Sequence, residues 1–341
     1  MRRDGGPRIR VRAAAAAAIL LAAIALLSGC ARQNAARGPD VVAVETFLAD
    51  MARQVAGDRL SVGSLIPAGV EPHGYEPAPR DVVAVAGARL LIVNGAGLES
   101  FLSRLIAGAG GAPRVVEASA GLVSRTAREG ETAENPGAAG GVSVGGASAG
   151  AVAGAAAEPD PHFWLDPTLA VRYVENIRDG LVAVDPGGAG SYSANAAAYI
   201  AKLHALDRWI AAQLAAIPPA DRKLVTNHES LGYFADRYGL RIVGTIIPSV
   251  SAEAAPSARQ LARLVDALKA AGVKAVFLET GSSAQLPRQV AREAGAAVVT
   301  ELYTHALSDP SGPAPSYIAM MEYDTRTIVS ALTGGAEGTA R

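Results

Sequence analysis

The chain has 341 residues, half of them hydrophobic and 18% charged, with a formal net charge of −1 at pH 7. This length and apolar content suit two compact lobes, and the near-neutral charge argues against nucleic acid as a partner, because phosphate backbones select basic surfaces. The single cysteine excludes an internal disulfide, so we expect any metal site to use nitrogen and oxygen ligands.

The N-terminal segment has the pattern of an export signal. Five arginines precede an apolar run over residues 13–27, and Cys30 follows almost at once. The run has 15 residues, fewer than the roughly 20 that a membrane-spanning helix needs, so we expect residues 1–29 to be a cleaved signal peptide. Leu-Ser-Gly-Cys at 27–30 resembles the bacterial lipobox. That resemblance implies that Cys30 is lipidated and anchors an exported protein to the extracytoplasmic side of the membrane. The alternative is an incidental cysteine in a plain signal peptide.

Apolar runs then alternate with amphipathic segments from Asp40 to about Asn94. The pattern predicts strands at 41–44, 60–66 and 90–93, and helices at 46–56 and 79–86. Continuous apolar strands between helices are typical of a parallel sheet covered on both faces. We expect an N-terminal α/β lobe over residues 40–188. Within it, Gly, Ala and Ser dominate residues 126–157, which favours a flexible surface loop.

A long helical pattern follows, in which apolar residues recur at spacings of three and four from Tyr192 to Ile217, and Pro218 and Pro219 stop it. We expect residues 189–219 to form a linker helix that joins two lobes as a stiff hinge. The alternating rhythm then returns, with strands predicted at 223–226, 241–246 and 275–278 and helices at 229–238 and 257–271. Residues 220–341 are therefore predicted to form a second α/β lobe.

Four of the five histidines lie at predicted junctions between strands and helices, two in each lobe: His73, His162, His228 and His305. Ligands of open parallel sheets bind outside the carboxyl ends of the strands, so two facing lobes can present four imidazoles to one point in the cleft between them. Imidazole suits zinc, copper, nickel and iron, whereas carboxylate and water suit manganese, magnesium and calcium. The fifth, His204, lies inside the long helix and is expected to be structural or solvated.

Four segments give the chain a specific resemblance: His-Gly-Tyr-Glu-Pro at 73–77, Asp-Pro-His-Phe-Trp-Leu-Asp-Pro at 160–167, Asn-His-Glu-Ser-Leu-Gly-Tyr-Phe at 227–234 and Leu-Tyr-Thr-His-Ala-Leu at 302–307. They resemble signature segments of the metal-binding lipoproteins of bacterial zinc, manganese and iron ABC importers. The resemblance implies two (β/α) lobes joined by a rigid helix, one metal buried between them, and a membrane permease as partner. It carries ligand roles to His73, His162 and His228.

The chain departs from that family's pattern at positions that bear on the metal. His305 stands where the family usually has Asp, and His228 stands where manganese-type members tend to have a carboxylate. Both differences add nitrogen and remove oxygen, so we expect Zn²⁺, with Mn²⁺ or Fe²⁺ as the alternative. Many zinc members have a histidine-rich loop where residues 126–157 lie, and this chain has none.

Glu229 and Glu279 are the carboxylates nearest to the histidines in the sequence, and either could accept an imidazole N–H behind the metal. Helix capping or a surface ion pair is the alternative for Glu229. A metalloenzyme needs an open coordination position for water, which four histidine ligands would close, so we expect no enzyme. An adhesion or interaction lipoprotein that has lost the site is a further alternative, and we expect a monomer.

Overall fold

The structure is a computed structural model that describes residues 38–110, 113–125, 159–247, 256–334 and 339–340. The predicted signal peptide, Cys30 and the predicted loop at 126–157 lie outside the described residues. Residues 39–341 form one compact unit.

The first sheet is parallel, and its strands lie in the order β2-β1-β3-β4. β1 and β3 are fully buried in the middle of the sheet. Successive side chains of a strand point to opposite faces, so Val41 and Leu90 face one core while Val42 and Leu91 face another. The strands are β1 (Val41–Ala43), β2 (Val62–Ser64), β3 (Leu90–Val93) and β4 (Arg114–Glu117).

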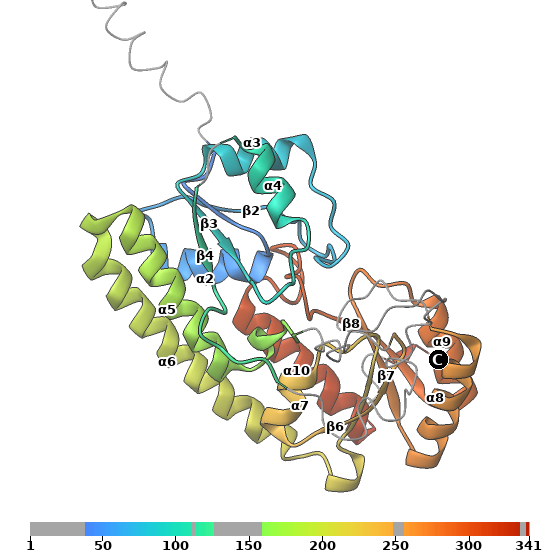
Figure 1. Cartoon of the computed structure of the whole chain (residues 1–341). Coiled ribbons are helices and arrows are strands. Elements are labelled where there is room, and N and C mark those ends of the chain that lie inside the picture. Colours follow the sequence, from blue (N-terminus) through green and yellow to red (C-terminus); the bar gives the residue numbers. More distant parts are fainter. Residues whose placement is uncertain (1–37, 111–112, 126–158, 248–255, 335–338, 341) are drawn as a thin grey trace, which may run out of the picture. The chain divides into compact units, whose positions relative to one another are not determined.

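Helices cover both faces of this sheet (Figure 1). One face packs against α3 and α4, and the other packs against α2 and α5. The helices are α2 (Thr46–Ala56), α3 (Pro79–Gly87), α4 (Leu102–Gly108) and α5 (Pro167–Val184). This arrangement confirms the predicted parallel α/β lobe.

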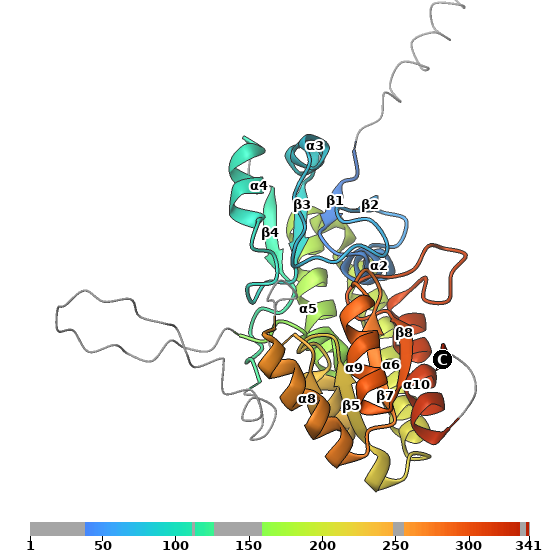
Figure 2. The ribbon, with the colours of Figure 1, turned by 90° about the vertical axis from the view of Figure 1, so that its right-hand side faces the viewer.

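The second sheet has the order β6-β5-β7-β8-β9, and its pairs are parallel except for the short β9, which runs antiparallel to β8. Its strands are β5 (Lys223–Thr226), β6 (Arg241–Thr245), β7 (Ala275–Glu279), β8 (Ala297–Leu302) and β9 (Thr339–Ala340). Helices α8 (Ala258–Ala271) and α9 (Gln285–Ala294) cover one face and lie on the side nearest the viewer in Figure 2. Helix α7 (Gly232–Tyr238) follows β5, and α10 (Tyr317–Thr333) packs against β8.

The long helix α6 (Ala189–Leu214) has 26 residues, so it is about 39 Å long. Its buried side chains recur at spacings of three and four, from Tyr192 to Leu214, and they pack against α5, α2 and α10. The helix ends at Leu214, three residues before the predicted end of the apolar pattern at Ile217 and five before the predicted end of the linker helix at residue 219. The predicted lobe boundaries at 188 and 219 remain predictions.

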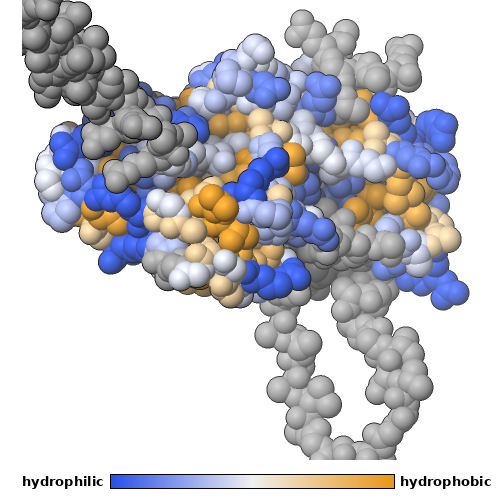
Figure 3. All heavy atoms as spheres, turned by 90° about the horizontal axis from the view of Figure 1, so that it is seen from above, coloured by the Kyte–Doolittle hydropathy of each residue, from blue (hydrophilic) through white to orange (hydrophobic). Residues whose placement is uncertain are grey.

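The largest hydrophobic cluster includes residues of both sheets, for example Ile92 and Phe277, together with α2, α5, α6 and α10. The inner faces of the two lobes therefore share one continuous core. Among the described residues, no helix is long and apolar enough to cross a membrane. Figure 3 shows a face on which polar residues and small apolar patches are interspersed.

Candidate metal centre

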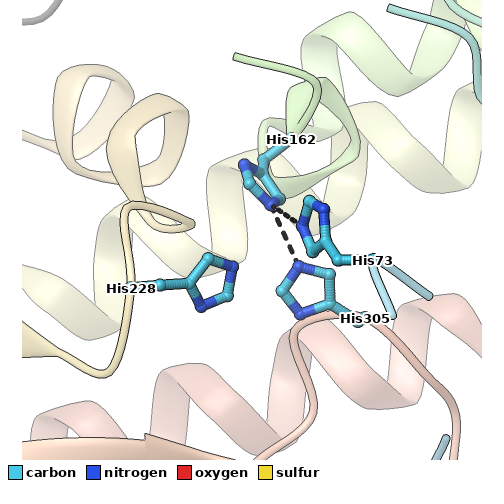
Figure 4. A group of neighbouring side chains, drawn as sticks. All are labelled: His73, His162, His228 and His305. Carbon is cyan, nitrogen blue, oxygen red and sulfur yellow. Dashed lines mark hydrogen bonds between the residues drawn. The ribbon is translucent and has the colours of Figure 1, made fainter. Parts of the chain in front are cut away.

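Four imidazoles meet at one point between the two sheets (Figure 4). His73 lies in the segment between β2 and α3, and His162 lies just before the short 3-10 helix Phe163–Leu165. His228 lies between β5 and α7, and His305 lies between β8 and α10. One ring nitrogen of each residue lies within 4.8 Å of those of the other three. Because each residue follows a strand or precedes a helix, the carboxyl-end rule for parallel sheets explains their convergence.

Packing fixes two of these imidazoles relative to each other. Trp164 stacks on Phe47 of α2 with ring centroids 4.5 Å apart. Its Nε1–H donates to the carbonyl of Thr304 at 2.7 Å. Trp164, two residues after His162, is thus hydrogen-bonded to Thr304, the residue just before His305. This contact holds both histidines against the shared core.

The ring nitrogens that face one another are Nε2 atoms. The Nε2 atom of His162 lies 3.0 Å from that of His305 and 3.3 Å from that of His73, as the dashed lines in Figure 4 mark. A tetrahedral zinc with Zn–N bonds of about 2.05 Å places its ligand nitrogens about 3.3 Å apart. Both His228 nitrogens are buried without a hydrogen-bond partner among the described residues. Two of the distances between ring nitrogens are therefore close to those of a tetrahedral site, and one nitrogen of each of the four rings lies within 4.8 Å of those of the other three.

Carboxylates lie behind three of the rings. Asp160 Oδ1 lies 2.8 Å from His162 Nδ1. Glu279 reaches two imidazoles, with Oε1 3.0 Å from His228 Nδ1 and Oε2 3.1 Å from His305 Nδ1. The contact between Asp160 and His162 is a hydrogen bond, and a carboxylate that accepts Nδ1–H fixes the tautomer and leaves Nε2 bare. The bare Nε2 atom of His162 can then accept a hydrogen bond from Nε2–H of His305 at 3.0 Å, and a metal that binds at this point displaces that proton.

Glu279 is itself held in place by two hydroxyl groups. Ser230 Oγ donates to Oε1 at 2.8 Å, and Thr304 Oγ1 donates to Oε2 at 2.6 Å. Burial alone would raise the pKa of Glu279, but His228 and His305 outweigh it and hold that pKa well below its ordinary value. The buried carboxylate is therefore an anion. It lies against His228, which follows β5, and against His305, which follows β8.

Burial and mutual repulsion also set the charge state of the rings. Burial, with repulsion from His305 and His228, lowers the pKa of His73 to about 3. The same causes lower the pKa of His162 well below its ordinary value. Burial opposes protonation of His305, but Glu71 and Glu279 outweigh it and raise the pKa of His305. His73 and His162 are thus neutral at pH 7, which is the form that binds a metal.

The structure thus brings together the four histidines singled out in the sequence, and it leaves His204 exposed on the outer face of α6. Glu279, one of the two candidate carboxylates, lies against two rings, and its role behind the metal remains a prediction. Glu229 is half-buried beside His228, and its role remains a prediction.

Sequence reasoning gave no role to two further carboxylates, Asp160 and Glu71. Each stands two residues before a histidine in an acid-Pro-His triplet and accepts the backbone N–H of that histidine, at 3.0 Å for His162 and 3.2 Å for His73. This repeated triplet was the signal that could have identified both residues.

Comparisons with known proteins agree with this geometry. Residues 41–331 match the family model described as zinc-uptake complex component A, periplasmic. The chain is 33% identical over 320 residues to the manganese-binding lipoprotein MntA of Halalkalibacterium halodurans, covering 92% of this chain and 97% of that protein. It is 28% identical to the iron ABC transporter substrate-binding lipoprotein MtsA of Streptococcus pyogenes, covering 86% and 88%.

Among solved structures, the periplasmic zinc-binding protein TroA of Treponema pallidum superposes with a TM-score of 0.73 at 24% identity, covering 86% of this chain and 99% of that one. At this identity the likeness shows the fold alone.

Proposed function

Since the chain belongs to the zinc-uptake component A family, the metal-binding solute-binding proteins of ABC importers, we propose that its cargo is zinc, bound by His73, His162, His228 and His305. Proteins of this family bind cargo for transporters and are not enzymes. The metal is therefore the substrate of transport and not a resident cofactor.

The observation that carries the proposal is the composition of the centre. Four imidazole nitrogens converge, and the two nearest carboxylates, Asp160 and Glu279, are placed at Nδ1 atoms behind the rings. Borderline nitrogen ligands favour zinc over manganese, which prefers hard oxygen. His305 supplies a nitrogen where the family pattern usually has an Asp.

Manganese or iron is the second candidate. The two relatives above are named for manganese and iron, and a carboxylate oxygen of Glu71 lies 3.7 Å from His305 Nδ1. If the Glu71 and Glu279 side chains turned inward, the site would gain the oxygen ligands that these ions prefer.

Metal analysis of the purified mature chain, followed by competition between zinc and manganese, tests the choice of cargo. We expect one zinc per chain and a zinc affinity well above that for manganese. Tighter binding of manganese would replace zinc with the second candidate. A chain that binds neither ion would refute the four-histidine site.

The proposal includes the cellular setting: export, lipidation at Cys30, a monomeric state and transfer of the cargo to a membrane permease. The lipobox at residues 27–30 supports the anchor. Replacing Cys30 with Ala should release the protein from the membrane fraction. Retention of that variant in the membrane would rule out lipidation as the anchor.

A further inference from the structure

Glu71 lies between two of the proposed ligands, His73 and His305, which come from different lobes. Its Oε1 accepts the backbone N–H of His73 at 3.2 Å. Its Oε2 lies 3.7 Å from His305 Nδ1. Glu71, Glu279 and His305 form a second group of side chains whose ligand atoms lie close together.

The second oxygen of Glu71 has no hydrogen-bond partner among the described residues, although it is buried. A buried acceptor without a partner is costly. A small movement that supplied this oxygen with a donor would therefore be favourable. The nearest histidine ring nitrogen is Nδ1 of His305, which also lies 2.8 Å from Thr304 Oγ1 and 3.1 Å from Glu279 Oε2, and a contraction of under about 1 Å would bring Glu71 within hydrogen-bond distance of it as well.

The segment that carries Glu71 packs closely against the second lobe. Gly281, whose φ is +85°, lies so near that a Cβ there would meet the carbonyl oxygen of Gly69 at 3.0 Å and the amide nitrogen of Glu71 at 3.7 Å. The turn after β7 and the segment 69–73 therefore lie in close contact. Glu71 is the side chain that links this segment to a ring of the centre.

An open pocket of about 290 Å³ adjoins the same junction. Its lining includes Gly69 from the segment of Glu71, Thr280 next to Glu279, and Tyr303 two residues before His305. The pocket thus ends within one or two residues of Glu71, Glu279 and His305, and it is the side from which water or a competing chelator would approach the centre if the contact between Glu71 and His305 loosened.

We propose that Glu71 is a positioning residue that fastens the His73 segment to His305 when metal is bound, and that it thereby sets how long the cargo stays in the site. Metal on Nε2 draws electrons from the ring and makes Nδ1–H a better donor. Glu71 then shares this proton with Glu279. Because its Oε1 accepts the backbone N–H of His73 while its Oε2 accepts from His305, Glu71 holds His73 close to the ion. This inference rests on the proposed function.

The test is the zinc dissociation rate of the full mature chain, measured by stopped-flow transfer to an excess of fluorescent chelator. Glu71→Gln keeps the shape of the side chain and removes its charge. We expect it to raise the dissociation rate by about tenfold, as the loss of one charge-assisted hydrogen bond implies. Glu76→Gln is the matched control, because Glu76 is exposed in the same segment, and it should leave the rate unchanged.

Two further readouts separate positioning from other roles. The ligand-field spectrum of the cobalt form should be the same in Glu71→Gln as in the parent, because Glu71 is not a ligand. In a His305→Ala background, Glu71→Gln should change the zinc dissociation rate by less than twofold, because its partner is gone.

A parental rate in Glu71→Gln, an equal change in Glu76→Gln, a changed cobalt spectrum or a full effect without His305 would each overturn the inference. The parent chain's own zinc stoichiometry, measured in the same series, shows separately whether the proposed function fails.

Discussion

Replacing Glu279 with Gln tests whether the buried carboxylate prepares the centre for metal. In the parent, its two oxygens lie 3.0 and 3.1 Å from the Nδ1 atoms of His228 and His305. A Gln side chain has one oxygen and one NH₂ group, so it can accept from only one ring. The other ring loses its acceptor and is free to take the tautomer that puts hydrogen on Nε2, where the metal must bind.

The structure sets the size of the effect. A hydrogen bond to a charged group contributes about 1.5–3 kcal/mol, which corresponds to about 10- to 150-fold in affinity. Both contacts are close but neither is aligned as a hydrogen bond, since His228 Nδ1 has no hydrogen-bond partner among the described residues and His305 Nδ1 pairs with Thr304 Oγ1 at 2.8 Å, so the lower part of this range applies. We expect zinc to bind about 10- to 100-fold more weakly, in line with other outer partners of metal-bound histidines.

Zinc affinity is measured by competition with a chelator of known affinity at pH 7.5, with Glu293→Gln as the control, since Glu293 is exposed on α9 in the same lobe. Thermal melting of the metal-free forms shows whether the variant is folded. A folded Glu279→Gln chain with an affinity within twofold of the parent would refute the view that this carboxylate orients the rings.

His305→Asp should weaken zinc more than manganese, because a hard oxygen replaces a borderline nitrogen; an unchanged ratio of the two affinities in competition titrations would contradict a ligand role for His305. His162→Ala should lower zinc affinity at least tenfold, or about 1.4 kcal/mol, whereas His204→Ala should leave it intact in the same titration because His204 is exposed on α6. A strong loss in His204→Ala would mean that the site is elsewhere. Burial raises the pKa of Asp324 to about 8 in the folded chain, so the stability that this carboxyl contributes is complete below its ordinary pKa and is lost as the pH rises toward 8. Asp324→Asn still offers an acceptor to the Tyr303 N–H, and it should raise the melting temperature of the metal-free chain at pH 8 more than at pH 5; an equal shift at both pH values would contradict the assignment.

The sequence by itself determined the elements whose signal is local. Helix α2 spans the residues predicted for it, and so do strands β3 and β5, because buried apolar runs and amphipathic periodicity are properties of neighbouring residues. The histidines could be singled out for the same reason. Each stands at the end of a recognisable strand or beside a recognisable helix, and parallel topology brings such ends together.

Local signals were less reliable where a tertiary contact uses the backbone. The helix predicted from Glu229 begins at Gly232. The residues before it form a turn instead, in which Thr226 Oγ1 donates to the carbonyl of His228 at 2.7 Å and Ser230 Oγ donates to Glu279. These hydrogen bonds hold His228 and Glu279 in place, and they set the start of helix α7 more than helix propensity does.

Only the tertiary structure decided which carboxylate serves which imidazole. Glu229 is adjacent to His228 in the sequence, yet Glu279, from the end of a neighbouring strand, lies against both His228 and His305. The pairing of β5 with β7 and of β7 with β8 places Glu279 between these two rings. The approach of Glu71 to His305 depends on packing between the segment 69–73 and the second lobe. Such contacts are set by the distance between elements far apart in the chain, and residue type and spacing do not contain that information.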